Sequence, residues 1–98
     1  MSKGYVYAEF EITDPEAWEK YVPLAQASLA DFGARYVVRG GDPALLEGDQ
    51  GSRLVSILEF ESRARARDWY HSSQYQAAKV IRMSAAKVTV VLFSGASP

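Results

Sequence analysis

Apolar and polar residues alternate strictly from Tyr5 to Ile12. A period of two is typical of a β-strand that turns one face to a hydrophobic core. The apolar face carries Val6, Ala8, Phe10 and Ile12, and the opposite face carries Tyr5, Tyr7, Glu9 and Glu11. The pattern therefore predicts a strand with a core face and a second face of tyrosines and carboxylates.

A helical period replaces the alternation after Thr13. Pro15 suits the first helical position, Glu16 puts an acid in the first turn, and Thr13 with Glu16 has the spacing of a capping box. Spacings of three and four then define one apolar stripe, made of Trp18, Tyr21, Val22, Ala25, Leu29 and Phe32. We expect a kink or a break at Pro23 and the end of the helix at Gly33.

Two more strands are predicted, over residues 34–41 and 53–60. In the first, one face carries Tyr36 and Val38, and the other carries Arg35, Val37 and Arg39. The second has apolar residues on both faces, which predicts protein above and below it. These residues are Leu54, Val55, Ile57, Leu58 and Phe60. The polar loop between the strands contains Leu45 and Leu46, so we expect it to fold back and cover another part of the protein, such as a sheet edge.

Two helical pieces follow, at about residues 63–70 and 73–84, with a bend between them at His71-Ser72. Residues 87–93 form a last strand that is rich in β-branched side chains. The order of elements is β-α-β-β-α-β, the split βαβ arrangement. It predicts a ferredoxin-like α+β fold with a four-stranded antiparallel sheet, the first and third strands in its centre and the helices on one face.

The sheet face away from the predicted helices is too apolar to be left in water. It combines aromatic, aliphatic and charged residues, namely Tyr5, Tyr7, Glu9, Arg35, Val37, Arg39, Val55, Ile57 and Glu59. A second copy of the chain is the simplest cover for this face, in a face-to-face dimer with two-fold symmetry. The sequence therefore predicts a homodimer through the sheet face.

The composition narrows the class of protein further. A chain of 98 residues fits one domain over residues 1–98, with residues 95–98 as a loose tail. The net charge of −1 argues against nucleic acid or an anionic membrane as a partner, and the longest apolar run, Val88 to Phe93, is too short to span a bilayer. The chain has no cysteine, which excludes disulfides and thiol chemistry and fits the cytoplasm, where we expect the protein.

Several short motifs together point to a known family. They are RYVVRGG at 35–41, LEG at 46–48, RLVSILEF at 53–60, WYHSSQY at 69–75 and IR at 81–82. With them the chain resembles the family catalogued as domain of unknown function 1330, which is similar in fold to the dimeric α+β barrel superfamily. The resemblance implies that fold and a dimer, and it implies no reaction. His71 stands where the family commonly has Asn or a similar residue, and Ser73 stands where it commonly has Pro, so the resemblance assigns no role to His71 and no local cap geometry.

Four charged residues share the predicted outer face of the sheet, Glu9, Arg35, Arg39 and Glu59. Arg35 is expected opposite Glu59. Such a pair binds an anionic ligand or supplies a base in some proteins, and in others it balances charge at an interface, which is the commoner case. Glu59 is thus one catalytic candidate. The other is His71, the only histidine, since imidazole can act as a general base near neutral pH, although a lone loop histidine is more often a surface residue.

Metal and cofactor sites are not predicted. The chain has no second histidine and no carboxylate cluster with ligand spacing. Gly40-Gly41 is not followed by the Lys-Ser/Thr pair or the helix start of a phosphate loop, so these glycines suit a β-bulge or a turn with positive φ.

A small-molecule site, if the protein has one, is expected between the helices and the sheet. Its aromatic residues are Trp69, Tyr70 and Tyr75 with Trp18 and Tyr21, for which core packing is the competing interpretation. We expect the mouth at the bend and name Arg39, Arg53, Tyr70 and Tyr75 as ligand-binding candidates. Two functions stay open. One is binding of an apolar or aromatic ligand with one polar end, with or without cofactor-independent isomerase, cyclase or monooxygenase chemistry. The other is a non-catalytic dimeric module with a packed interior.

Overall fold

The computed structural model describes residues 2–49 and 53–96. Along the chain it contains β1 (Gly4–Ile12), α1 (Pro15–Asp31), β2 (Arg35–Arg39), β3 (Leu54–Phe60), α2 (Arg63–His71), α3 (Ser73–Ala85) and β4 (Ala86–Ser94). The predicted order is confirmed, including the division of the second helical region into two helices.

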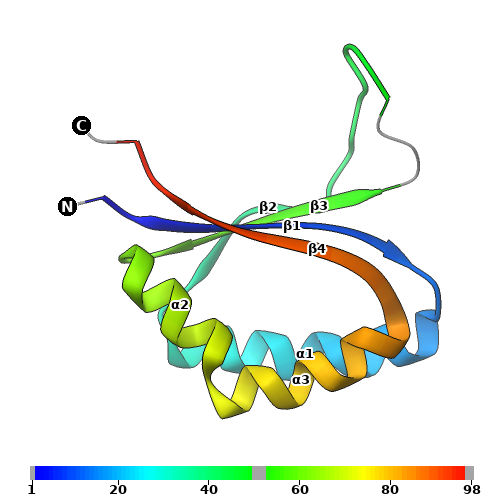
Figure 1. Ribbon diagram of the computed structural model, residues 1–98. Coiled ribbons are helices and arrows are strands. Elements are labelled where there is room, and N and C mark those ends of the chain that lie inside the picture. The colour runs from blue at the N-terminus through cyan, green and yellow to red at the C-terminus, as the bar shows by residue number, and fades with distance from the viewer. Residues whose placement is uncertain (1, 50–52, 97–98) are drawn as a thin grey trace.

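The strands form one antiparallel sheet in the order β2-β3-β1-β4, so the two strands predicted to be central are central. All three helices lie on one side of this sheet (Figure 1). We call that side the inner face, which carries Val6 and Leu58, and the other side the outer face, which carries Tyr7 and Ile57. The ferredoxin-like α+β fold is therefore confirmed.

Asp14, rather than Thr13, caps the start of α1. One Asp14 carboxylate oxygen accepts a hydrogen bond from the Ala17 backbone N–H at 3.3 Å, so the predicted capping box is wrong. The helix runs unbroken through Pro23, which is exposed, and water can occupy the position of the hydrogen bond that proline lacks. Gly33 ends the helix as predicted, with a φ of 66° that favours glycine.

A single serine joins α2 to α3. The Ser72 hydroxyl donates to the Trp69 carbonyl at 2.7 Å and accepts from the Tyr75 backbone N–H at 3.1 Å. One side chain therefore ends the first helix and starts the second, which fixes the bend at the predicted position.

A β-bulge in β2 changes which face its last residues occupy. The pairs across β2 and β3 are Tyr36 with Leu58, Val38 with Ile57, and Arg39 with Ser56. Val37 is thus an extra residue with no partner of its own, and the residues after it exchange faces. Val38 lies on the outer face and Arg39 on the inner face. The expectation that Arg39 shares the outer face with Arg35 is wrong because strict alternation stops at the bulge.

The loop after β2 leaves the sheet on the side opposite the helices, as residues 41–49 show (Figure 1). Leu45 is 57% exposed and Leu46 is 97% exposed. The expectation that these leucines fold back over the sheet is therefore wrong for the single chain. Residues 50–52 of the predicted loop lie outside the described residues.

Two further expectations concern the end of the chain and membranes. Gly95 donates its backbone N–H to the Lys3 carbonyl at 2.7 Å, which ties the start of the predicted tail to the strand edge. Residues 97–98 of that tail lie outside the described part of the chain. Within the described residues, no helix has the length and apolar character needed to cross a membrane.

Candidate functional site

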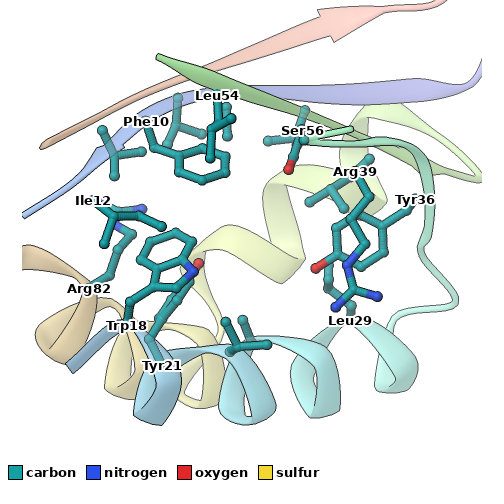
Figure 2. A pocket seen from close by; sticks show the side chains of 18 of the residues that line it. Phe10, Ile12, Trp18, Tyr21, Leu29, Tyr36, Arg39, Leu54, Ser56 and Arg82 are labelled. Carbon is teal, nitrogen blue, oxygen red and sulfur yellow. The ribbon is translucent and has the colours of Figure 1, made fainter. Parts of the chain in front are cut away.

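A cavity of about 380 Å³ lies between the inner face of the sheet and the helices. Its volume falls in the range of roughly 300–1,000 Å³ that is typical of small-molecule sites. Figure 2 shows Phe10 and Leu54 from the sheet on one side of the cavity and Trp18 and Tyr21 from α1 on the other. Most of the lining is apolar, as expected for a site that takes an apolar molecule.

The apolar stripe of α1 forms one wall of the cavity. Trp18, Tyr21, Ala25 and Leu29 follow at helical spacings and all line it. The Trp18 ring stacks on the Phe10 ring with their centroids 4.9 Å apart and an angle of 18° between their planes. The helix and the central strand therefore meet through aromatic rings at one end of the cavity.

Trp69 of α2 is held firmly against α1. Its indole N–H donates to the Ser28 hydroxyl at 2.9 Å, and that hydroxyl donates to the Ala25 carbonyl at 2.7 Å. The Trp69 and Tyr75 ring centroids lie 4.1 Å apart. Both residues are buried and both line the cavity, so the core interpretation and the pocket interpretation of these aromatics apply together.

Three side chains form what we call the polar corner: Tyr21, Tyr75 and Arg82. The two tyrosine hydroxyl oxygens are 2.9 Å apart, and Arg82 Nη1–H donates to the Tyr75 hydroxyl at 2.9 Å. Arg82 follows Tyr75 by seven residues, about two turns of α3, which places both on one side of that helix. The polar corner thus joins one side chain of α1 to two side chains of α3.

Arg82 is buried without a counter-ion. Only 8% of its surface is exposed, and its Nε–H has no hydrogen-bond partner. The salt bridges found among the described residues do not include it. A buried guanidinium in this state is costly, because the protein replaces only part of its lost hydration.

The polar corner offers hydrogen-bond donors at neutral pH. Burial raises the pKa of Tyr21 well above its ordinary value of 10.0, and the neighbouring Tyr75 hydroxyl raises it further. Tyr21 is therefore a neutral phenol under physiological conditions. The described residues that line the cavity include no Asp, Glu or His. The polar corner can therefore donate hydrogen bonds to an oxygen-rich group of a ligand.

Arg39 lies at the opposite side of the cavity from Arg82 (Figure 2). Its guanidinium carbon is 4.8 Å from the centre of the Tyr36 ring, a cation–π arrangement. Burial raises the pKa of Tyr36. Arg39 and Gly41 are the exposed residues of the lining, which places the opening of the cavity at the end of β2.

The structure brings two of the four ligand-binding candidates, Arg39 and Tyr75, into this cavity. Arg53 lies elsewhere. Its guanidinium is 2.7 Å from a carboxylate oxygen of Glu9 on the outer face. The cause is the strand parity of β1, which directs Glu9 away from the helices.

Tyr70, the fourth candidate, lines a second hollow of about 290 Å³ together with His71, beside β4. Hydrogen bonding to the Lys79 ammonium lowers the pKa of Tyr70, and burial opposes this shift. His71 is exposed. The expected mouth at the helical bend therefore belongs to this second hollow, and the larger cavity opens at the end of β2.

Glu59, the other catalytic candidate, lies on the outer face. Its carboxylate accepts hydrogen bonds from Arg35 Nε–H and from the Tyr5 hydroxyl, both at 2.8 Å, and Lys3 lies 4.0 Å away. The predicted pairing with Arg35 is confirmed. Hydrogen bonding to Arg35 and then to Tyr5 lowers the pKa of Glu59. Glu59 is thus remote from the cavity, on the opposite face of the sheet.

Sequence reasoning missed Arg82 as a site residue. The signal was present, because the buried face of α3 reads Tyr75, Ala78, Arg82 and Ala85 at spacings of three and four. A single arginine inside an apolar helical stripe indicates a cation that faces the core. Tyr21 was predicted as one of the pocket aromatics, but its hydrogen bond was not, because the partner hydroxyl belongs to Tyr75, 54 residues later in the chain.

A metal centre finds no support in residues 2–49 and 53–96, which hold no group of three or more His, Cys, Asp or Glu side chains placed to bind an ion.

Comparison with known families agrees with this architecture. The model of the family described as Domain of unknown function (DUF1330) matches residues 3–96. The chain belongs to this family. A comparison with curated proteins gives no match.

Solved structures with the same fold span almost the whole chain. A protein of unknown function from Rhodopseudomonas palustris has a TM-score of 0.79 at 17% identity, covering 99% of this chain and 85% of that one. A cofactor-independent oxygenase from Streptomyces nogalater has a TM-score of 0.68 at 13% identity, covering 100% and 97%. A dimeric ferredoxin-like protein of unknown function from Thermobifida fusca has a TM-score of 0.57 at 15% identity, covering 95% and 91%. At these identities the similarity establishes the fold alone.

Proposed function

We propose that the protein binds a small, mainly apolar or aromatic molecule with one polar end in the cavity between the helices and the sheet. The observation that carries this proposal is the cavity itself, which combines about 380 Å³ of space with an apolar lining and a few polar groups. Sites for small molecules usually have this composition, because apolar contact supplies affinity and a few polar groups fix orientation. The cavity favours ligand binding over a packed, non-catalytic module.

Catalysis on that ligand is the second candidate function. One solved structure with this fold is a cofactor-independent oxygenase. Hydrogen-bond donors such as the Tyr21 and Tyr75 hydroxyls and the Arg82 guanidinium can stabilise an oxyanion that develops during a reaction. This supports an isomerase, cyclase or monooxygenase type of reaction that draws on oxyanion stabilisation.

A titration with a phenolic acid tests the binding proposal. 4-Hydroxycinnamic acid is added to the ¹⁵N-labelled protein, and amide shifts are followed by NMR. We expect saturable shifts around Tyr21, Arg39 and Tyr75. The Ala8→Phe variant is the control, because Ala8 lines the cavity and a larger side chain there fills it. The absence of shifts at millimolar ligand, or shifts that survive in Ala8→Phe, would contradict the proposal.

A homodimer through the outer face is the assembly that we infer for this protein. Val38, Val91 and Phe93 lie on that face and are 41%, 38% and 51% exposed, which is unfavourable for a monomer in water. The dimeric ferredoxin-like protein with the same fold supports this assembly. The loop with Leu45 and Leu46 rises on the same side of the sheet, where a second copy can cover it (Figure 1).

A further inference from the structure

The polar corner has more hydrogen-bond donors than acceptors. The two phenols carry two O–H protons, and one of these joins Tyr21 to Tyr75. The Tyr75 oxygen also accepts from Arg82 Nη1–H. One phenol proton is then left for a further acceptor, and Arg82 Nε–H is buried with no acceptor at all. A group rich in oxygen lone pairs can supply further acceptors to the corner.

The charge of the polar corner also favours an oxygen-rich ligand group, and specifically an anion. Arg82 carries one positive charge with 8% of its surface exposed, and the described lining of the cavity holds no carboxylate to balance it. A buried positive charge attracts an anion strongly where water is excluded. On the outer face, by contrast, Arg35 and Arg53 each have a carboxylate partner within 2.8 Å.

We propose that the polar end of the ligand is a carboxylate, bound by Arg82 and by the remaining phenol proton of the Tyr21–Tyr75 pair. One carboxylate oxygen accepts from the Arg82 guanidinium and the other accepts from the phenol. The inference rests on the proposed binding function and names its ligand class, a small aromatic or aliphatic monocarboxylic acid. A phosphate dianion fits less well, because its second negative charge finds no counter-charge in the corner.

An acid and its amide test the ligand class. 3-Phenylpropionic acid and 3-phenylpropionamide have the same apolar part and differ in the charge of the polar end. Their dissociation constants are measured by NMR titration or calorimetry on the full chain and on Arg82→Met, Arg82→Lys and Tyr75→Phe variants. Arg53→Gln is the matched control, since it removes an arginine that lies outside the cavity.

In the parent protein we expect the acid to bind about tenfold or more tightly than the amide. Arg82→Met abolishes that preference, Arg82→Lys keeps part of it, and Arg53→Gln keeps all of it. Tyr75→Phe reduces it and serves as the readout if Arg82→Met does not fold. Equal binding of acid and amide by the parent overturns the carboxylate inference while the binding function stands. Failure of both molecules to bind overturns the binding function as well.

Discussion

The two faces of the sheet treat their charged residues in opposite ways. On the outer face, Glu59 accepts a hydrogen bond from Arg35 at 2.8 Å, and Glu9 lies 2.7 Å from Arg53. The two arginine side chains there are 69% and 49% exposed, so water shares in their solvation. On the inner side, Arg82 is buried, and the salt bridges among residues 2–49 and 53–96 do not include it. Arginine thus has a carboxylate partner on the outer face, whereas the buried arginine on the inner side is in none of the salt bridges of the described residues.

We interpret this difference as one between charges that serve the fold and a charge that is available to a ligand. In an ion pair at an exposed or interfacial face, each charge already has its partner, so little charge is available to bind a ligand. An unpaired buried cation lowers the stability of the unliganded protein, and such a cost is typical of functional sites. The catalytic candidates named from sequence, Glu59 and His71, lie outside the cavity, whereas Arg82 lines it and has a buried Nε–H without a hydrogen-bond partner in the described part of the chain.

The largest effect is expected from a charge placed in the apolar part of the outer face. Ile57 lies opposite Tyr7 on this face, and Ile57→Asp would bury an unpaired carboxylate in the inferred dimer interface. We expect the dimer to be destabilised by about 3–5 kcal/mol. Sedimentation at micromolar concentration should then show a monomer near the chain mass of 10.8 kDa.

The control for this experiment is Val80→Asp. Val80 is 70% exposed on α3, on the helical side of the molecule, so the variant should sediment like the parent. A parent protein that sediments as a monomer, or an Ile57→Asp variant that stays dimeric, would remove the basis for the outer face as an interface.

On the inner side of the sheet we expect the opposite effect, a substitution that stabilises the protein. Arg82→Met replaces an unpaired buried cation by an apolar side chain of similar length, so the free energy of unfolding should rise by about 1–3 kcal/mol. Leu58→Ala is the control, because truncation of this buried leucine should lower it by about 2–5 kcal/mol. Urea denaturation measures both. A clear loss of stability in Arg82→Met would show that the arginine serves the core.

The element order and the faces of the regular strands were predictable from local pattern. Period-two alternation gave the two sides of β1, and the bend at Ser72 followed from the interruption of the helical period. These features depend on residues that are neighbours in sequence. The pairing of Arg35 with Glu59 was predictable because an antiparallel register relates the two strands simply.

The site itself was less predictable, because it depends on a β-bulge and on a hydrogen bond between residues far apart in the sequence. The bulge at Val37 turns Arg39 toward the cavity. The glycine pair after the strand predicted a bulge or a turn with positive φ, and Gly40 has the positive φ, whereas the bulge lies earlier in the strand. The bond between Tyr21 and Tyr75 joins helices far apart in the chain. No periodicity in either helix reveals that their hydroxyls meet.

A smaller effect is expected at the outer-face ion pair. The pKa of Glu59 in the folded protein is below the ordinary value of 4.5, because Arg35 and Tyr5 bind its charged form. The stability that this carboxylate contributes is therefore fully present above pH 4.5 and is lost as the pH falls through its folded pKa. Glu59→Gln should lower the melting temperature at pH 7, and the difference from the parent should shrink as the pH falls below 4.5 and through the folded pKa of Glu59.

The exposed Glu61 provides the control for that pH dependence, since Glu61→Gln should melt in parallel with the parent at every pH. A Glu59→Gln difference that stays constant from pH 7 until the protein unfolds in acid would mean that the charge of Glu59 contributes nothing.

The smallest effect separates the two cations that the sequence offered for ligand binding. Arg39 is exposed at the opening of the cavity, across from Arg82, whereas Arg53 is paired with Glu9 on the other face of the sheet. A charge at the rim of a site acts mainly on association, by steering an approaching anion, and salt screens its effect. Arg39→Gln should therefore slow association of 3-phenylpropionate by roughly two- to fivefold at low salt and leave dissociation unchanged. Arg53→Gln should change neither rate, and NMR line shapes at two salt concentrations measure both. Equal slowing by the two substitutions would mean that the ligand approaches from the outer face, and the bulge at Val37 would then have no part in binding.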